Sequence, residues 1–235
     1  MFNGQIDILY YIEGAKKAEG LTVIIDVFRA FSLECYLYEK GVKVIRPVET
    51  IEETFTLGKI FSNSVLIGER KGKKCEGFDF GNSPSAIEHV NLEGKIIIHT
   101  TSAGTQGIVN AKKAEEIITG SLVNARAVAS YILKKNPKKV SLVCMGNNGV
   151  TPAPEDELCA FYIKSILEGK ELENFDKKVA DLQVNGGEHF FKEENREVFP
   201  REDFWYCIKY DKFPFIIRVE KDETGYYTIR EFLDR

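Results

Sequence analysis

The sequence feature that most constrains the fold is a near-continuous apolar run, Val23-Ile24-Ile25, which ends in Asp26 and is followed three residues later by Arg29. A run without polar alternation is typical of a parallel strand covered on both faces, and a helical pattern begins directly after it. In open α/β sheets, ligands bind at the carboxyl ends of such strands, so we expect Asp26 and Arg29 at the mouth of a crevice. A local ion pair between these two side chains is an equally good interpretation of this corner.

Strand and helix patterns alternate along most of the chain, which predicts an α/β fold with mainly parallel strands. Further strands are predicted over residues 5–10, 42–48, 64–67, 95–100, 116–119, 139–145, 204–209, 213–219 and 226–230, and helices over 29–40, 49–59, 121–135 and 152–168, with another running to 113. The last two strands form a C-terminal β-hairpin that turns through residues 222–225. The 235 residues suffice for one large or two modest domains, and we assign no structure to residues 168–203.

The composition argues against several classes of protein. A formal net charge of −4 disfavours nucleic acid as a partner, because binding to phosphate backbones is driven by clustered basic charge. No apolar stretch is long enough to span a membrane and the first residues have no signal-peptide pattern, so we expect a cytoplasmic protein without a membrane partner. The five cysteines are odd in number, widely spaced and without a Cys-x-x-Cys pair, so most are expected to be buried packing residues.

Three polar segments are candidates for chemistry, and each also has a purely structural interpretation. The long stretch 69–84 is unusual for a compact domain, but its lysine-rich part 71–74 suits a solvent-exposed tip and Gly81-Asn82-Ser83-Pro84 suits a turn. The segment 100–105 places hydroxyls and a glycine between strand and helix, as an anion cradle or an ordinary helix cap does. Acids at 155–157 open a helix, where the macrodipole favours them without any metal.

Five segments together carry a family resemblance. They are Ile25-Asp26-Val27-Phe28-Arg29-Ala30, Gly68-Glu69-Arg70, Gly77-Phe78-Asp79-Phe80-Gly81-Asn82-Ser83-Pro84, Thr100-Thr101-Ser102-Ala103-Gly104-Thr105 and Glu155-Asp156. With them the chain resembles the 2-phosphosulfolactate phosphatase family over roughly residues 20 to 220, and the Gly-Phe-Asp-x-Gly-Asn-Ser-Pro segment is the most specific. The resemblance implies magnesium-dependent hydrolysis of the phosphate ester of 2-phospho-3-sulfolactate, a step of coenzyme M synthesis. It also implies two α/β domains around an active-site cleft, which we place at residues 1–90 and 91–235.

Two places depart from the family's pattern. Phe31-Ser32 stand where the family often has a Thr pair, a change that would reshape the pocket wall. Ala103 stands where many members have Asn, which removes a side-chain contact.

The residues themselves fit a metal-assisted phosphatase, partly by elimination. Phe28 stands where a haloacid-dehalogenase-type enzyme needs its second Asp, no cysteine has the Arg of a cysteine-phosphatase loop, and there is no Walker A sequence. Magnesium needs only one or two carboxylates besides substrate oxygens and water, and Asp26 with Glu155 or Asp156 would supply them. The metal would polarise the phosphoryl oxygens and orient or acidify a water molecule.

The predicted site combines these residues. Its candidate catalytic residues are Asp26, Arg29, Glu69, Arg70, Glu155 and Asp156, its candidate magnesium ligands are Asp26, Glu155 and Asp156, and its candidate substrate-binding residues are Asn82, Ser83, Thr100, Thr101, Ser102, Gly104 and Thr105. Arg29 and Arg70 are expected to bind opposite ends of a small anionic phosphorylated substrate, since guanidinium groups hold oxyanions bidentately. We expect His89, His99 and His189 to be structural, with His99 the exception to watch at a strand end.

Two other functions stay open at this point, as does a homodimer. One is a phosphatase of the same chemistry that acts on another small phosphorylated acid, because a resemblance fixes the reaction better than the substrate. The other is a non-catalytic module that binds an anionic metabolite with the same arginines. A measurement of metal-dependent phosphate release distinguishes a phosphatase from a module that only binds the metabolite.

Overall fold

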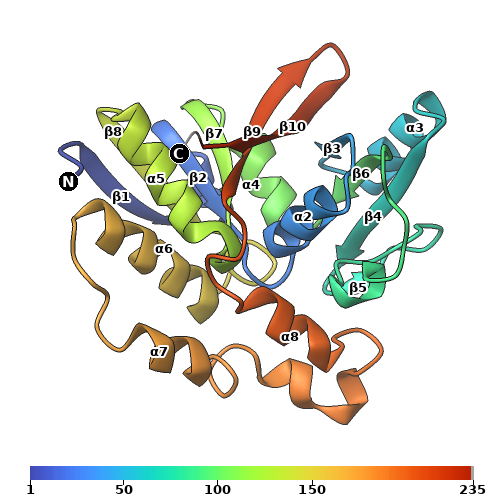
Figure 1. Ribbon diagram of the computed structural model, residues 1–235. Helices are drawn as coiled ribbons and strands as arrows, with labels where there is room; N and C mark the ends of the chain where they lie inside the picture. Colours follow the sequence, from blue (N-terminus) through green and yellow to red (C-terminus); the bar gives the residue numbers. More distant parts are fainter. Residues whose placement is uncertain (234–235) are drawn as a thin grey trace.

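The computed structural model describes residues 1–233, in which ten strands join one mixed sheet (Figure 1). The strands are β1 (Gln5–Tyr10), β2 (Gly20–Ile25), β3 (Val44–Pro47), β4 (Ser64–Arg70), β5 (Lys73–Lys74), β6 (Ile96–Thr100), β7 (Ala114–Gly120), β8 (Lys139–Cys144), β9 (Phe215–Asp222) and β10 (Gly225–Phe232). Their order across the sheet is β1-β8-β2-β7-β9-β10-β3-β6-β4-β5.

The sheet consists of two parallel blocks with an antiparallel hairpin between them. In the first block β1, β8, β2 and β7 run parallel, and in the second β3, β6 and β4 run parallel. The hairpin β9–β10 pairs with β7 on one side and, through Thr228 and Ile45, with β3 on the other. Figure 1 shows the two blocks inclined about this hairpin, so that the carboxyl ends of β2 and β4 point toward the same region.

Helices cover both faces of the first block. The helices are α1 (Tyr11–Ala15), α2 (Ala30–Glu39), α3 (Ile51–Ile60), α4 (Gly104–Asn110), α5 (Ala125–Lys135), α6 (Pro154–Leu167), α7 (Phe175–Asp181) and α8 (Arg201–Cys207), and short 3-10 turns are η1 (Ser85–Ile87), η2 (Leu122–Asn124), η3 (Glu188–Phe191) and η4 (Glu193–Asn195). Helices α5 and α6 pack against each other on one face, and α1 and α4 pack against each other on the opposite face.

Strand β2 is the centre of this arrangement, as its apolar run predicts. All six of its residues are buried. Val23 and Ile25 pack into the cluster that contains α5 and α6, whereas Ile24 packs on the other face against Phe31 and Ile108. Full burial of each such side chain contributes about 1.5–3 kcal/mol, so this strand is a rigid base for Asp26 and Arg29 beyond its carboxyl end.

The α/β class and the C-terminal β-hairpin are confirmed, and most predicted elements lie within a few residues of their expected positions. The helix expected to reach Lys113 ends at Asn110, and α1 was not predicted. The division into domains 1–90 and 91–235 stays a prediction, and in the sheet β6 lies between β3 and β4.

The predicted strand 204–209 is wrong, because this segment belongs to helix α8. Phe204 and Cys207, three residues apart, are fully buried, while Trp205 between them is half exposed. That spacing is the helical one, and a run of aromatic residues does not distinguish it from strand alternation.

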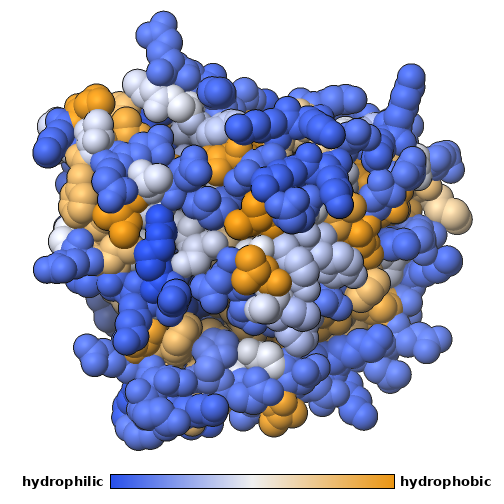
Figure 2. Space-filling model, turned by 180° about the vertical axis from the view of Figure 1, so that it is seen from behind, coloured by the Kyte–Doolittle hydropathy of each residue, from blue (hydrophilic) through white to orange (hydrophobic). Residues whose placement is uncertain are grey.

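Residues 168–203, which had no prediction, form α7, η3, η4 and the first turn of α8. This 168–203 segment lies below the carboxyl ends of the strands in Figure 1 (orange). Figure 2 shows the opposite side of the molecule, where hydrophobic residues are scattered among hydrophilic ones. No helix within residues 1–233 has the length and apolar character needed to cross a membrane. All five cysteines are buried and unbonded to one another, as expected.

Candidate active site

A cavity of about 210 Å³ lies where the carboxyl ends of β2, β4, β6 and β8 meet the 168–203 segment. Its walls are formed by Asp26, Phe28, Arg29, Glu69, Lys71, Gly72, Asn82, Ser102, Ala103, Gly146, Asn147, Asn148, His189 and Phe199. Strands from both parallel blocks contribute, so the cavity occupies the position where α/β proteins bind ligands.

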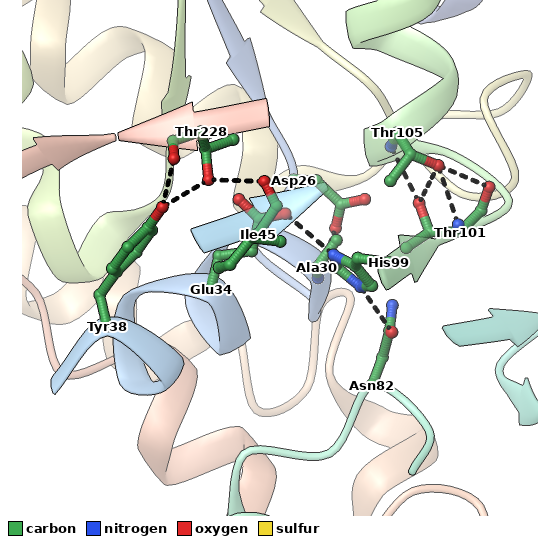
Figure 3. Close-up of polar contacts among 10 residues, drawn as sticks. All are labelled: Asp26, Ala30, Glu34, Tyr38, Ile45, Asn82, His99, Thr101, Thr105 and Thr228. Carbon is green, nitrogen blue, oxygen red and sulfur yellow. Dashed lines mark hydrogen bonds and ion pairs between the residues drawn. The ribbon is translucent and has the colours of Figure 1, made fainter. Parts of the chain in front are cut away.

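Asp26 follows β2 directly and is nearly buried at 7% exposure. Its Oδ1 accepts a hydrogen bond of 3.2 Å from the Ala30 N–H in the first turn of α2 (Figure 3), and the Gly104 N–H also donates to this carboxylate. A Cβ on Gly104 would stand only 2.9 Å from Asp26 Oδ2, so the close approach of α4 requires glycine here. Burial raises the pKa of Asp26 to about 7, and the neighbouring Glu69 carboxylate adds to this effect.

Arg29 does not pair with Asp26, so the local ion pair is not formed. Its Nη1 donates to Asp203 Oδ2 at 2.7 Å, and its Nη2 donates to the Gly72 carbonyl at 3.3 Å. The guanidinium lies over the Phe199 ring, 4.8 Å from the centroid. Both charged side chains are almost fully buried, so the arginine is held in one position on the cavity wall.

Asp203 is the residue that organises this side of the site. Its Oδ1 accepts hydrogen bonds from the hydroxyls of Ser83 and Ser85 and from the Ser85 N–H, at 2.7–2.9 Å. It therefore ties α8 both to Arg29 and to the turn that contains Ser83. Asp203 was not predicted from the sequence, because it ends the stretch 168–203 to which the sequence assigned no structure.

Glu69 lines the cavity, but its oxygens are bonded to the chain. Oε1 accepts from the Ser102 N–H and Oε2 from the Gly72 N–H, both at 2.6 Å. Lys71 and Gly72 have φ values of +53° and +80°, as in the two-residue turn that joins β4 to β5. Glu69 thereby fixes this turn against the segment after β6, and the turn brings Lys71 to the cavity.

Arg70 lies outside the cavity. It donates to the carbonyls of Glu69 and Glu49 and to Thr100 Oγ1, at 2.8–3.1 Å. It lines an adjoining, wider depression of about 800 Å³. Lys71 and Ser102 line both hollows, so the depression continues from the cavity toward Arg70.

The hydroxyl segment after β6 is mostly occupied by its own hydrogen bonds. The Thr105 N–H donates to Thr101 Oγ1 at 3.0 Å, and the Thr101 N–H donates to Thr105 Oγ1 at 2.8 Å (Figure 3). Of the predicted substrate-binding hydroxyls in this segment, Ser102 lines the cavity while Thr100, Thr101 and Thr105 do not. The N-cap residue of α4 is Ala103 and no side chain caps it, so the two threonines form a local hydrogen-bonded pair beside the helix rather than an ordinary helix cap.

Asp156 connects the segment after β2 to the loop after β8, two segments that form walls of the cavity. Its Oδ1 accepts from the Val27 N–H and its Oδ2 from the Gly146 N–H, both at 2.8 Å. The residue is buried and does not line the cavity. Burial raises the pKa of Asp156 well above its usual range, and the Asp26 charge adds to this. A helix dipole alone does not account for such a contact.

Glu155, the neighbour of Asp156 in sequence, is also buried and does not line the cavity. Its Oε2 has no hydrogen-bond partner. A Cβ on Gly186 would stand 2.8 Å from that oxygen. Burial raises the pKa of Glu155 well above its usual range, with Asp156 adding to the shift. The catalytic and metal-binding roles of both acids stay predictions.

His189 from the 168–203 segment also lines the cavity, although it was expected to be structural. Its ring packs against Phe28, Phe190 and Phe199. Burial lowers the pKa of His189 to about 4, and the nearby Arg29 charge adds to this, so the ring is neutral at neutral pH.

Three further cavity residues were not predicted, although two of them had a usable signal. Asn147 and Asn148 lie in the glycine-flanked loop after β8, at a predicted strand end. Lys71 was expected at a solvated tip. Phe31 and Ser32 do not line the cavity, so this departure from the family's pattern does not form its wall, whereas Ala103 does line it.

The cavity suits a cation that keeps part of its water shell. Asp26 and Glu69 are its lining carboxylates. Residues 1–233 contain no group of three or more His, Cys, Asp or Glu side chains placed to hold a metal ion. Magnesium is commonly bound through one or two carboxylates together with water and substrate oxygens. The repulsion that raises the pKa of Asp26 beside Glu69 is the kind that a divalent cation relieves.

The chain is similar in sequence to known proteins over most of its length. Residues 9–222 match the sequence profile of the family described as 2-phosphosulpholactate phosphatase. A probable 2-phosphosulfolactate phosphatase of Carboxydothermus hydrogenoformans is 40% identical over 182 residues, which cover 77% of this chain and 75% of that protein. Proteins of the same name from Bacillus subtilis and Clostridium perfringens (strain SM101) are 29% and 33% identical, each covering 86% of this chain and 88% of the relative.

Proposed function

Since the chain belongs to the 2-phosphosulfolactate phosphatase family of phosphoric monoester hydrolases, we propose that it hydrolyses 2-phospho-3-sulfolactate to 3-sulfolactate and phosphate, with Mg²⁺ as cofactor. The reaction is a step of the kind used in coenzyme M biosynthesis. The observation that carries the proposal is the cavity at the carboxyl ends of β2, β4, β6 and β8, whose walls include both the fixed Arg29 and the buried Asp26.

The charge distribution of the cavity favours a small anion. Arg29 and Lys71 are the cations on its walls, and Asn82, Asn147 and Asn148 add neutral polar groups. A substrate with phosphate, sulfonate and carboxylate groups would be repelled by Asp26 and Glu69 without such compensation. At about 210 Å³ the cavity excludes large ligands, and the depression that adjoins it gives room for one end of the substrate.

Asp26 would hold the magnesium ion, with Glu69 beside it on the same wall. When bound, magnesium would polarise the phosphoryl oxygens and lower the pKa of a bound water. The protein itself holds Arg29 in place on the cavity wall through Asp203, so its remaining N–H groups would not need to reorganise to bind the phosphoryl oxygens. Asp156 and Glu69 keep the cavity walls at a fixed separation, which limits the reorganisation that binding would otherwise cost.

His189 takes a different part in this proposal. As a neutral ring among Phe28 and Phe199 it excludes water from one side of the cavity. Arg29 lies next to the same aromatic group, and its attraction for an anion is stronger where water is excluded.

The cytoplasmic location, the absence of a nucleic-acid partner and a homodimer stay predictions that belong with this proposal. The small cavity, with Arg29 and Lys71 on its walls, supports a small anionic substrate as the main partner.

The proposal is tested by measuring phosphate release from a panel of phosphorylated acids, with EDTA present or absent. We expect the highest kcat/KM with 2-phospho-3-sulfolactate, loss of activity in EDTA and recovery on addition of Mg²⁺. If another phosphorylated acid is hydrolysed with an equal or higher kcat/KM, the assignment of 2-phospho-3-sulfolactate as the substrate is wrong. Binding of the anions without phosphate release would overturn the enzyme activity.

A further inference from the structure

A chain of three polar side chains connects helix α2 to the cavity. Glu34 lies on α2, His99 lies on β6, and Asn82 precedes η1. His99 Nδ1 lies 2.9 Å from Glu34 Oε1, and His99 Nε2 lies 3.1 Å from Asn82 Oδ1 (Figure 3). Glu34 and His99 are completely buried and off the cavity, whereas Asn82 forms part of its wall.

The burial of Glu34 restricts the position of the histidine ring. Its second oxygen, Oε2, has no hydrogen-bond partner and no contact with solvent. The carboxyl group is therefore bonded through Oε1 alone, and its contact with Nδ1 holds the His99 ring in one orientation.

The atom that Asn82 presents to the ring shows which role Nε2 has. That atom is the carbonyl oxygen Oδ1, which can only accept a hydrogen bond. Nε2 is therefore the donor in this contact. A carboxamide turned the other way would set its NH2 group against the Nε2 hydrogen.

The orientation of Asn82 has a consequence for the ligand. With Oδ1 bonded to His99 (Figure 3), Nδ2 is the carboxamide atom that remains for another partner. Asn82 lies on the same cavity as Arg29 and Ser102. Its two N–H groups are then suited to an anionic oxygen and unsuited to a metal cation.

We propose that the Glu34–His99 pair fixes the Asn82 carboxamide so that Nδ2 donates to an anionic oxygen of the bound substrate. Asn82 thus contacts the substrate, and His99 and Glu34 are positioning residues that act through it. The inference rests on the proposed function, because it gives the substrate of that same site one further contact.

The first test compares Asn82→Asp with Asn82→Ala. A neutral hydrogen bond to a charged group is worth about tenfold to a hundredfold in affinity, so Asn82→Ala should weaken inorganic phosphate as a competitive inhibitor by about that factor. Asn82→Asp keeps the acceptor toward His99 but places an oxygen where Nδ2 was, and should weaken phosphate further still. If Asn82→Asp binds phosphate as well as wild type, the carboxamide oxygen faces the ligand side and the proposal is overturned.

The second test separates positioning from packing with two amides at position 99. Gln places its amide nitrogen near the position of His Nε2, so His99→Gln retains the donor to Asn82, whereas the shorter Asn does not reach it. We expect His99→Gln to stay within about threefold of the wild-type KM and His99→Asn to raise KM about tenfold or more, at similar urea midpoints. Equal KM values for the two variants would assign His99 a structural role alone and overturn the positioning role.

These outcomes are distinct from failure of the proposed function. A wild-type protein that releases no phosphate from any phosphorylated acid would remove the enzymatic role. Calorimetry with inorganic phosphate on the same variants still decides whether Asn82 donates to an anion, and equal phosphate affinity in wild type and Asn82→Ala would overturn that contact.

Discussion

The corner after β2 and the segment after β6 both carry polar residues at the carboxyl end of a strand. They differ in how far along the sequence their hydrogen-bond partners lie. After β6, Thr101 and Thr105 satisfy each other across four residues. After β2, Val27 is bonded to Asp156 and Arg29 to Asp203, at sequence separations of 129 and 174 residues. The first set stays within one local turn, and the second assembles the cavity.

The difference indicates where function is to be sought in such a chain. A polar group that is satisfied within its own turn contributes to local stability and needs nothing from the rest of the fold. A buried polar group that is satisfied by a distant element holds two elements at a fixed separation, which a binding site requires. Variants in the two regions should therefore differ in which quantity they change.

The largest effect is expected for Asp26→Asn, in the corner after β2. The variant keeps the size and most hydrogen bonds of the side chain but removes the charge that would orient magnesium. We expect kcat/KM to fall by about a thousandfold or more, since several kcal/mol of charge stabilisation depend on this carboxylate. The loss of stability should stay within about 1–3 kcal/mol, because at most one of the two backbone donors loses its acceptor. Activity within a few-fold of wild type would remove Asp26 from the chemistry.

Asp203→Ala comes next, because it leaves Arg29 buried without its partner. Removing one member of a buried ion pair costs about 3–5 kcal/mol, so the free energy of unfolding in urea should drop by that amount. The matched control is Asp203→Asn, which keeps an oxygen for Ser83 and Ser85 but loses the charge that faces Arg29.

We expect kcat/KM to fall more than tenfold in both Asp203 variants if positioning of Arg29 is what matters. Full activity in Asp203→Asn would show that Asp203 serves only to anchor the turn at Ser83.

Asp156→Asn and Glu155→Gln provide the next contrast, within one helix turn. Asn has a single acceptor oxygen for two backbone donors, so Asp156→Asn should cost about 1–3 kcal/mol and lower kcat/KM, because Val27 and Gly146 are held less firmly. Glu155→Gln should be neutral or stabilising at pH 7, since Oε2 has no partner to lose. If both variants lose an equal amount of unfolding free energy, about 0.3–1 kcal/mol, and keep wild-type kinetics, then both acids serve only to stabilise the helix through its dipole.

The same residue gives a dependence on pH with a definite sign. Burial raises the pKa of Glu155 in the folded protein above the unfolded value of about 4.3. The folded state therefore binds this proton more tightly, and the associated stability is present below about pH 4.3 and lost as the pH rises through the folded pKa. Glu155→Gln should gain stability relative to wild type between pH 4 and pH 7 in urea unfolding. A constant difference across that range would contradict the assignment.

The smallest effect is expected in the segment after β6. Thr101→Val and Thr105→Val each remove one hydroxyl of the local hydrogen-bonded pair, for which the usual cost is about 0.5–1.5 kcal/mol of stability. Because neither side chain lines the cavity, KM and kcat should stay near wild type. A large loss of activity with unchanged melting temperature would mean that this segment takes part in binding, and would break the contrast between the two regions.

Part of the candidate site could be predicted from the sequence. Asp26, Arg29, Glu69 and Ser102 were predicted from their positions at strand ends, and all four line the cavity. Arg70 has the same kind of position but points into the neighbouring depression. Successive residues of a strand face opposite sides, so two neighbours at its end do not share a cavity.

Other parts of the site and of the fold could not be predicted from the sequence. His189 and Asp203 lie in or next to a stretch with no clear periodicity, and its course over the strand ends depends on aromatic packing rather than on local propensity. The hairpin β9–β10 was predicted as a hairpin, but its insertion between two parallel blocks was not, because strand order is set by contacts across the whole sheet.

The sequence by itself determined the buried central strand, the alternation of strands and helices, and the polar residues at the end of each strand. These depend on burial and on backbone preferences that act within a few residues. Only the tertiary structure decided that Arg29 would pair with Asp203 rather than Asp26, and that Asp156 would hold Val27 and Gly146 instead of lining the cavity. A buried polar group must be satisfied by some partner, but the one that satisfies it is whichever group the rest of the fold brings within hydrogen-bond distance.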